Sequence, residues 1–140
     1  MIVCDTGPLV AAALSNDDNH RGCVDLFTAL HLAGRAIMVP GPVIAEVGYL
    51  LEREAGPSIE AAFLRSLAND DLQSLDLTHD DYARMAELVE TYADLPLGTT
   101  DASVIAASER LNLTEIATLD RRHFSVVRPA HVDAFTLLPD

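Results

Sequence analysis

The chain has 140 residues, enough for one domain with a hydrophobic core, and its formal net charge is −13. All nine basic residues are arginines, which excludes chemistries that need a lysine, such as P-loop nucleotide binding and Schiff-base catalysis. The strong acidity also argues against a protein that binds duplex DNA or an anionic membrane through a basic face.

Short apolar runs alternate with longer amphipathic stretches along the chain, which is typical of an α/β fold. In chain order, we predict a strand at 2–4, helices at 8–14 and from after residue 19 to Leu32, a strand at 36–39, and helices from Pro42 to about 56 and at 59–67. There follow a strand at 72–77, helices at 78–92 and about 101–111, a strand at 115–119, a turn at 120–124 and a last strand at 132–138. Strands separated by helices predict a mostly parallel sheet of about five strands, covered on both faces, with a ligand crevice at the carboxyl ends of the strands.

Cysteine usage and apolar runs indicate the compartment. Cys4 and Cys23 form no C-x-x-C pair, so we predict neither a disulfide framework nor a structural zinc site. No run of 18 apolar residues occurs, and no basic segment precedes the short apolar N-terminal stretch. We therefore expect a cytoplasmic protein without a membrane span or a signal peptide.

Four of the 22 acidic residues lie where a surface role does not explain them. Asp5 and Asp120 each follow an apolar strand, so both are expected at the carboxyl edge of the sheet. Asp101 shares the core-facing stripe of its helix, and Glu46 lies at the margin of the apolar face of another helix. Each acid alone also has a structural explanation, as a helix cap, a first-turn carboxylate or the start of a turn.

The four acids taken together are harder to explain by structure alone. If the crossovers are right-handed and the strands adjacent, their carboxylates meet above the sheet with few basic side chains to neutralise them. Clustered carboxylates repel one another, so such a cluster indicates bound cations. Oxygen ligands without a nearby cysteine or histidine pattern favour Mg²⁺ or Mn²⁺.

The motifs that carry these acids resemble those of PIN-domain ribonucleases, in particular the VapC-type toxins of bacterial toxin–antitoxin pairs. The resemblance covers essentially the whole chain and rests on IVCDTGPLVAA, PVIAEVGYLL, YADLPLGTTDASVIAASERLN and IATLDRRHF. It implies a single PIN domain over residues 1–140 with a three-layer α/β/α fold. It also implies an endoribonuclease that depends on Mg²⁺ or Mn²⁺ and inhibits translation by cleaving RNA.

The resemblance assigns both catalysis and metal binding to Asp5, Glu46, Asp101 and Asp120. It further implies a VapB-type antitoxin as partner, RNA as substrate, a homodimer, higher assembly in the antitoxin complex, and no membrane association.

Several neighbouring residues have two interpretations. Thr6 and Thr100 are candidates to orient the ligands through their hydroxyls, although Thr100 equally suits a helix cap. Asp94 lies in a segment that resembles the family, but a solvent-facing loop acid is the favoured interpretation. The segment Arg121, Arg122 and His123 suits contact with the RNA backbone, and it also suits a basic surface turn.

Other functions use some of the same residues. Asp5-Thr6-Gly7 matches the signature of aspartic proteases, but its position at the N-terminus and the helical pattern after it argue against a protease. A metal-dependent phosphatase or a nuclease for another substrate would use the same four acids. A catalytically weak PIN-fold binding module is the non-enzymatic alternative.

Overall fold

Five short strands form the centre of the structure, a computed structural model that describes residues 1–140. They are β1 (Ile2–Cys4), β2 (Ile37–Pro40), β3 (Gln73–Leu75), β4 (Glu115–Ala117) and β5 (Thr136–Leu138). All neighbouring pairs are parallel, and the spatial order is β3-β2-β1-β4-β5. The central strand β1 pairs with β2 through Val3 and Met38, and with β4 through Val3 and Ile116. The predicted parallel sheet of about five strands is confirmed.

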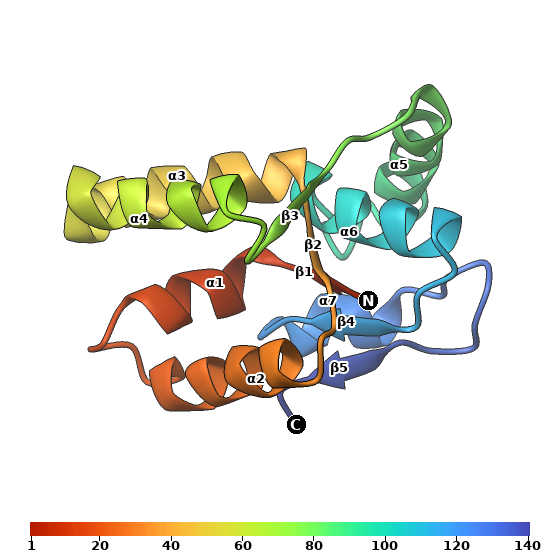
Figure 1. Ribbon diagram of the computed structural model, residues 1–140. Helices are drawn as coiled ribbons and strands as arrows, with labels where there is room; N and C mark the ends of the chain where they lie inside the picture. The colour runs from red at the N-terminus through yellow and green to blue at the C-terminus, as the bar shows by residue number, and fades with distance from the viewer.

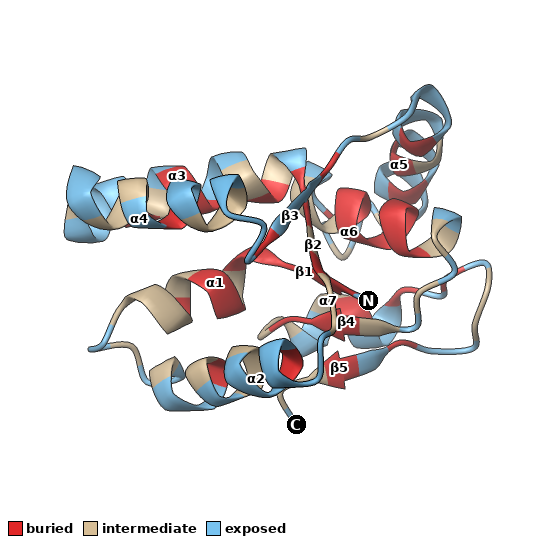
Figure 2. Cartoon of the chain, viewed as in Figure 1, coloured by how far each residue is buried: buried red, intermediate tan, exposed pale blue.

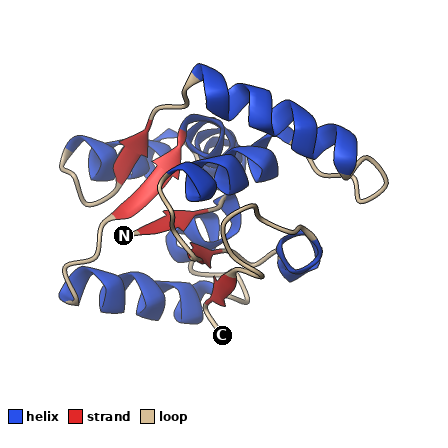
Figure 3. Cartoon of the chain, turned by 90° about the vertical axis from the view of Figure 1, so that its right-hand side faces the viewer, coloured by secondary structure: helices blue, strands red, loops and turns tan.

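Seven helices connect and cover the strands. They are α1 (Thr6–Ala13), α2 (His20–Leu32), α3 (Gly41–Ala55), α4 (Pro57–Ala68), α5 (His79–Thr91), α6 (Thr99–Arg110) and α7 (Arg121–Val126). Helices α1 to α4 lie on one side of the sheet and α5 to α7 on the other (Figure 1). The view turned by 90° shows the strands enclosed between helices (Figure 3). This is the three-layer α/β/α arrangement expected from the sequence.

The strand pattern and the helix periodicity both follow from burial. All three residues of β1 are fully buried, because both faces of the central strand are covered by helices (Figure 2). In α3, Val43, Val47 and Leu51 recur at four-residue spacing and form its buried face. A cluster of 25 buried apolar residues extends along the chain from Ile2 to Leu137. None of the helices combines the length and the apolar character that crossing a membrane requires.

Two elements near the C-terminus differ from the prediction. Residues 121–126 form helix α7 rather than a turn, because the Asp120 carboxylate accepts a hydrogen bond from the backbone N–H of His123 and caps the first turn. The last strand covers Thr136–Leu138 only. Just before it, the ring of His131 bonds to the carbonyl oxygen of Leu113. A side chain therefore contacts this backbone group where a longer last strand would run.

Candidate metal centre

The candidate centre lies between β1 and β4, where the order in which successive strands are added to the parallel sheet reverses. The adjacent strands β1 and β4 are followed by α1 and α7, which leave toward opposite faces of the sheet (Figure 1). In an open parallel sheet, such a switch point forms a crevice at the carboxyl ends of the strands. Asp5 follows β1 directly, and its backbone N–H donates to the Ala117 carbonyl at 2.8 Å. Asp120 lies three residues beyond the end of β4, not directly after it as predicted.

Asp5 is the most deeply buried of the four acids, with 6% of its surface exposed. Its Oδ2 accepts a hydrogen bond from the Thr118 hydroxyl at 2.9 Å. Burial raises the pKa of Asp5 from its ordinary value of 3.8 to about 6, and the negative charges of Asp101 and Glu46 act in the same direction. Hydrogen bonds from the Thr6 backbone and from Thr118 oppose this shift. The fold therefore holds a carboxylate where ionisation is costly unless a cation is present.

Thr118 joins two of the acids and was missed by the sequence analysis. Its hydroxyl donates to Asp5 and accepts from the backbone N–H of Asp120 at 3.0 Å, and its side chain is almost fully buried. The available signal was a hydroxyl residue at the end of a buried strand, two positions before an acid. One side chain thus fixes the position of Asp5 relative to the segment that carries Asp120.

Replacing Thr118 by valine is expected to weaken the binding of a divalent cation about 10- to 100-fold, because Asp5 loses its orienting donor. It should also lower the free energy of unfolding by about 1–3 kcal/mol, since the Asp120 N–H loses its acceptor. Titration calorimetry and chemical denaturation measure the two effects. Serine keeps the hydroxyl and should restore most of the affinity for the cation. Wild-type affinity in the valine variant would contradict this role of Thr118.

Glu46 reaches the centre from α3. Its Oε2 accepts a hydrogen bond from the hydroxyl of Thr6, the first residue of α1, at 2.9 Å. The residue as a whole is exposed to solvent. Thr6 therefore has the contact that an orienting role requires, and the role itself stays a prediction.

Asp101 enters the centre from the first turn of α6. Its Oδ2 accepts from the backbone N–H of Gly98 at 3.4 Å, which holds the carboxylate at the start of the helix. Partial burial raises the pKa of Asp101, and the charges of Asp120 and Glu46 add to the shift, whereas the Gly98 hydrogen bond and His123 lower the pKa. Asp101 therefore interacts electrostatically with acids from two other elements.

Asp120 and His123 form a close pair at the start of α7. Nδ1 of His123 lies 2.6 Å from Oδ2 of Asp120, while Oδ1 accepts from the His123 backbone at 3.0 Å. One potential ligand atom from each of Asp101, Asp120 and His123 lies within 4.8 Å of the others. From the sequence, His123 was a candidate only for contact with RNA, whereas the structure places it beside two acids.

Asp5 and Glu46 are not among these three residues, although the charges of Asp101 and Glu46 raise the pKa of Asp5. Other predicted residues do not join the acids. Asp94 is exposed in the loop before α6. Thr100 lies inside the first turn of α6, where the helix cap is Gly98, so the interpretation of Thr100 as a cap was wrong. The Arg121 guanidinium donates to the carbonyl of Pro139, and Arg122 is exposed.

The donor set fits a divalent cation. The arginine ion pairs of the chain all involve other acids than Asp5, Glu46, Asp101 and Asp120. The negative charge at the carboxyl ends of β1 and β4 is therefore not balanced by arginine. Carboxylate oxygens in this arrangement suit Mg²⁺ or Mn²⁺, which would balance the charge that burial makes unfavourable.

Comparisons with known proteins agree with this fold. The PIN domain family model matches residues 2–128. The chain is 30% identical to Ribonuclease VapC26 of Mycobacterium tuberculosis, over 99% of this chain and 100% of that protein.

Two solved structures have the same fold. VapC20 of Mycobacterium tuberculosis, described as a sarcin-ricin loop cleaving toxin, matches with a TM-score of 0.73 and 19% identity, covering 83% of this chain and 87% of that one. VapBC2 of Rickettsia felis, bound to a DNA fragment from its promoter, matches with a TM-score of 0.69 and 16% identity, covering 99% and 100%. The family match and the full-length relative together establish that this chain belongs to the PIN-domain family and, within it, to the VapC group.

Proposed function

We propose that this protein is an endoribonuclease dependent on Mg²⁺ or Mn²⁺, and that it acts as the toxin of a type II toxin–antitoxin pair by cleaving RNA and so inhibiting translation. The observation that carries the proposal is the group of acids at the carboxyl ends of β1 and β4, which has no arginine counter-charge. Membership of the VapC group supports RNA as the substrate. We also propose that residues 1–140 form a single PIN domain, in line with the core that extends from Ile2 to Leu137.

In this proposal the carboxylates hold the cation and their neighbours fix the carboxylates. Asp5 and Asp101 are the direct ligands, and Glu46 and Asp120 complete the set directly or through water. The residues would hold a divalent cation there, and as a Lewis acid it would lower the pKa of a bound water and offset charge on the phosphodiester. The hydroxyl of Thr118 holds Asp5. None of these side chains has to act as a covalent nucleophile.

The arginine distribution supports local contact with RNA on an acidic protein. Five of the nine arginines form ion pairs with acids. Of the four that remain, Arg121, Arg122 and Arg128 follow Asp120 within eight residues. We propose Arg122 as a phosphate contact, with Arg121 contributing the part of its guanidinium that does not bind Pro139. The contact would be local because the rest of the surface repels RNA.

The function is tested with antitoxin-free protein and structured RNAs in Mg²⁺ or Mn²⁺. Replacing Asp101 by asparagine should reduce cleavage by more than about 100-fold, since loss of a direct ligand should cost at least as much as loss of a group that orients one. The matched control is Asp94→Asn, because this exposed acid lies outside the group and should leave cleavage unchanged. Equal loss in both variants, or cleavage of duplex DNA or a phosphomonoester in preference to RNA, would contradict the proposal.

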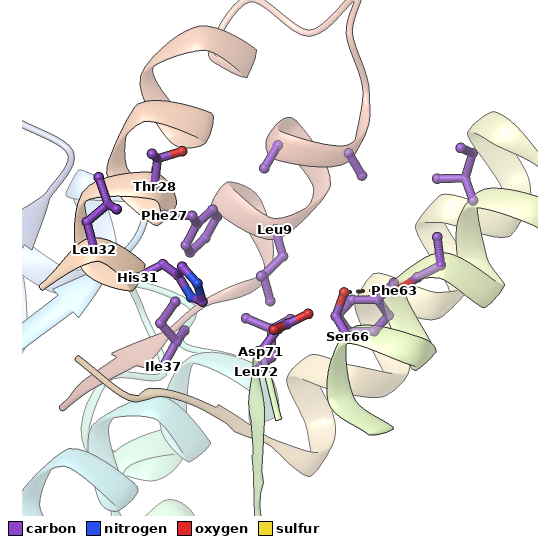
Figure 4. A pocket seen from close by; sticks show the side chains of 14 residues that line it. Leu9, Phe27, Thr28, His31, Leu32, Ile37, Phe63, Ser66, Asp71 and Leu72 are labelled. Atoms are coloured by element: carbon purple, nitrogen blue, oxygen red, sulfur yellow. Dashed lines mark hydrogen bonds between the residues drawn. The ribbon is translucent and has the colours of Figure 1, made fainter. Parts of the chain in front are cut away.

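An apolar groove supports the proposed partner, a VapB-type antitoxin. The groove has a volume of about 600 Å³ and lies between α1, α2 and α4. Leu9, Phe27 and Phe63 line it from these three helices, and Asp71 and Leu72 line it from the segment before β3 (Figure 4). We propose that an amphipathic antitoxin segment covers it, with basic residues that complement the charge of −13. A homodimer, and higher assembly in the antitoxin complex, are proposed alongside.

Replacing Leu32 by aspartate is expected to weaken antitoxin binding at least about 10-fold, because a charge would enter the apolar lining of the groove. Leu32 is 80% exposed, so the fold should not change. Leu64→Asp is the matched control, since Leu64 is 48% exposed on α4 but does not line the groove. Titration calorimetry measures both affinities. If only the Leu64 variant lost affinity, the groove would not be the binding site.

A further inference from the structure

We propose that Nδ1 of His123 is a ligand of the divalent cation beside Asp101 and Asp120, so that the centre has a mixed nitrogen and oxygen donor set. This rests on the cation-dependent function proposed above and adds a residue to it. In the sequence, no cysteine or histidine pattern marked the centre, and oxygen ligands alone were expected. The structure instead places the imidazole against the carboxylate of Asp120.

The first turn of α7 positions the two side chains together. Asp120 caps the helix and His123 lies three residues later, so both side chains lie on the same face. Oδ1 of Asp120 accepts a hydrogen bond from the backbone N–H of His123 at 3.0 Å, and this bond holds the two residues together. The imidazole therefore reaches the centre because of how the helix begins, not because of a flexible loop.

The distances match the size of a small cation site. With metal–ligand bonds of about 2.1 Å in an octahedral site, adjacent ligand atoms lie about 3 Å apart and opposite ones about 4 Å apart. Nδ1 of His123 lies 2.6 Å from Oδ2 of Asp120, and the three candidate ligand atoms all lie within 4.8 Å of one another. The pair formed by His123 and Asp120 thus has a separation close to that of adjacent ligands, and Asp101 lies near both.

Nδ1 of His123 also lacks another partner. The atom is buried, and despite its short distance to Asp120 it makes no hydrogen bond of acceptable geometry. Two other histidines use a ring nitrogen to bind a backbone carbonyl: His20 contacts Ala11, and His131 contacts Leu113. Nδ1 of His131 is buried without a partner as well, but no group of potential ligand atoms surrounds it. A cation would give Nδ1 of His123 the partner that it lacks.

An imidazole ligand changes which cation the centre prefers. Carboxylate and water suit Mg²⁺ and Mn²⁺, whereas imidazole favours later first-row metals and is a poor ligand for Mg²⁺. We therefore expect the protein to prefer Mn²⁺ to Mg²⁺ by a larger ratio than an all-oxygen centre would. Asparagine at position 123 places an amide oxygen near the position of Nδ1 and converts the set to oxygen donors.

The test is pulsed electron paramagnetic resonance of Mn²⁺ bound to tag-free, antitoxin-free protein. The wild-type spectrum should show coupling to a directly bound imidazole nitrogen, and His123→Asn should lose it. His79→Asn is the matched control, since His79 is exposed at the start of α5, and it should keep the coupling. Titration calorimetry should show that the ratio of Mn²⁺ to Mg²⁺ affinity falls about 10-fold in His123→Asn.

The outcomes separate this inference from the proposed function. Bound Mn²⁺ without nitrogen coupling in the wild-type protein would overturn the ligand role of His123, leave the acidic centre in place, and indicate that His123 only holds Asp120. No Mn²⁺ binding at all would overturn both. Circular dichroism checks the folding of His123→Asn, and the wild-type spectrum decides the question even if that variant fails to fold.

Discussion

Replacing Asp5 by asparagine is expected to abolish RNA cleavage while making the cation-free protein more stable at neutral pH. Asp5 is 6% exposed, and its pKa is raised to about 6, mainly by burial. Such a shift means that the ionised carboxylate costs on the order of 3 kcal/mol of folding free energy at pH 7. Asparagine has a similar shape and can still accept the Thr118 hydrogen bond, but it removes the buried charge.

Chemical denaturation in chelator at pH 7 should therefore show a higher free energy of unfolding for Asp5→Asn than for the wild type, by about 1–3 kcal/mol. Cleavage assays on the same preparation should show no activity above background. Asp94→Asn serves as the control, because an exposed acid should change neither quantity. A variant that is both less stable and inactive would indicate that Asp5 is a structural residue, and its lost activity would then say nothing about a cation.

Adding Mn²⁺ is expected to raise the melting temperature much more at pH 7.5 than at pH 5. The pKa values of Asp5 and Asp101 are both raised, so these two positions bind more protons in the folded state than in the unfolded chain, for Asp5 between about pH 4 and 6. Without a cation, this stabilisation is present at low pH and is lost as the pH rises through about 6. At pH 7.5 the carboxylates are charged and a cation offsets their repulsion, whereas at pH 5 it must first displace protons.

The size of this effect follows from mass action. A ligand present at 100 times its dissociation constant stabilises the fold by about 2.7 kcal/mol. For a chain of this length, that corresponds to a rise of roughly 5–10 °C in melting temperature at pH 7.5. Thermal scans at both pH values, with Mn²⁺ or with chelator, measure it. An equal rise at pH 5 and pH 7.5 would indicate that Mn²⁺ binds away from the acids with raised pKa values. Asp101→Asn provides the control, since it should reduce the rise at pH 7.5.

Local sequence signals predicted much of the fold. The apolar run of β1 and the four-residue spacing of Val43, Val47 and Leu51 depend on neighbours along the chain, and both elements were predicted. Thr78 and Asp81 form the capping box that the sequence indicated for α5. Helix α7 was missed because six residues are too few for a periodic pattern to be recognised.

The candidate centre was predicted only in part, for a reason of distance along the chain. Asp5 and Asp120 could be located from the apolar strands before them, although Asp120 lies three residues beyond the end of β4. The hydrogen bond between Thr118 and Asp5 joins residues 113 positions apart and depends on β1 and β4 being neighbours. Strand order is not encoded in local periodicity, so the sequence could indicate which acids gather but not which side chains orient them.

The most direct measurement of the central claim is cleavage of structured RNA by antitoxin-free protein, with Mg²⁺ or Mn²⁺ and with excess chelator. We predict cleavage in either cation, no cleavage in chelator, and recovery when Mn²⁺ is added back. Asp5 and Asp101 have raised pKa values, and none of the four acids has an arginine partner, so a cation is needed for them to work as a centre. Cleavage that continues at the same rate in chelator would contradict the claim.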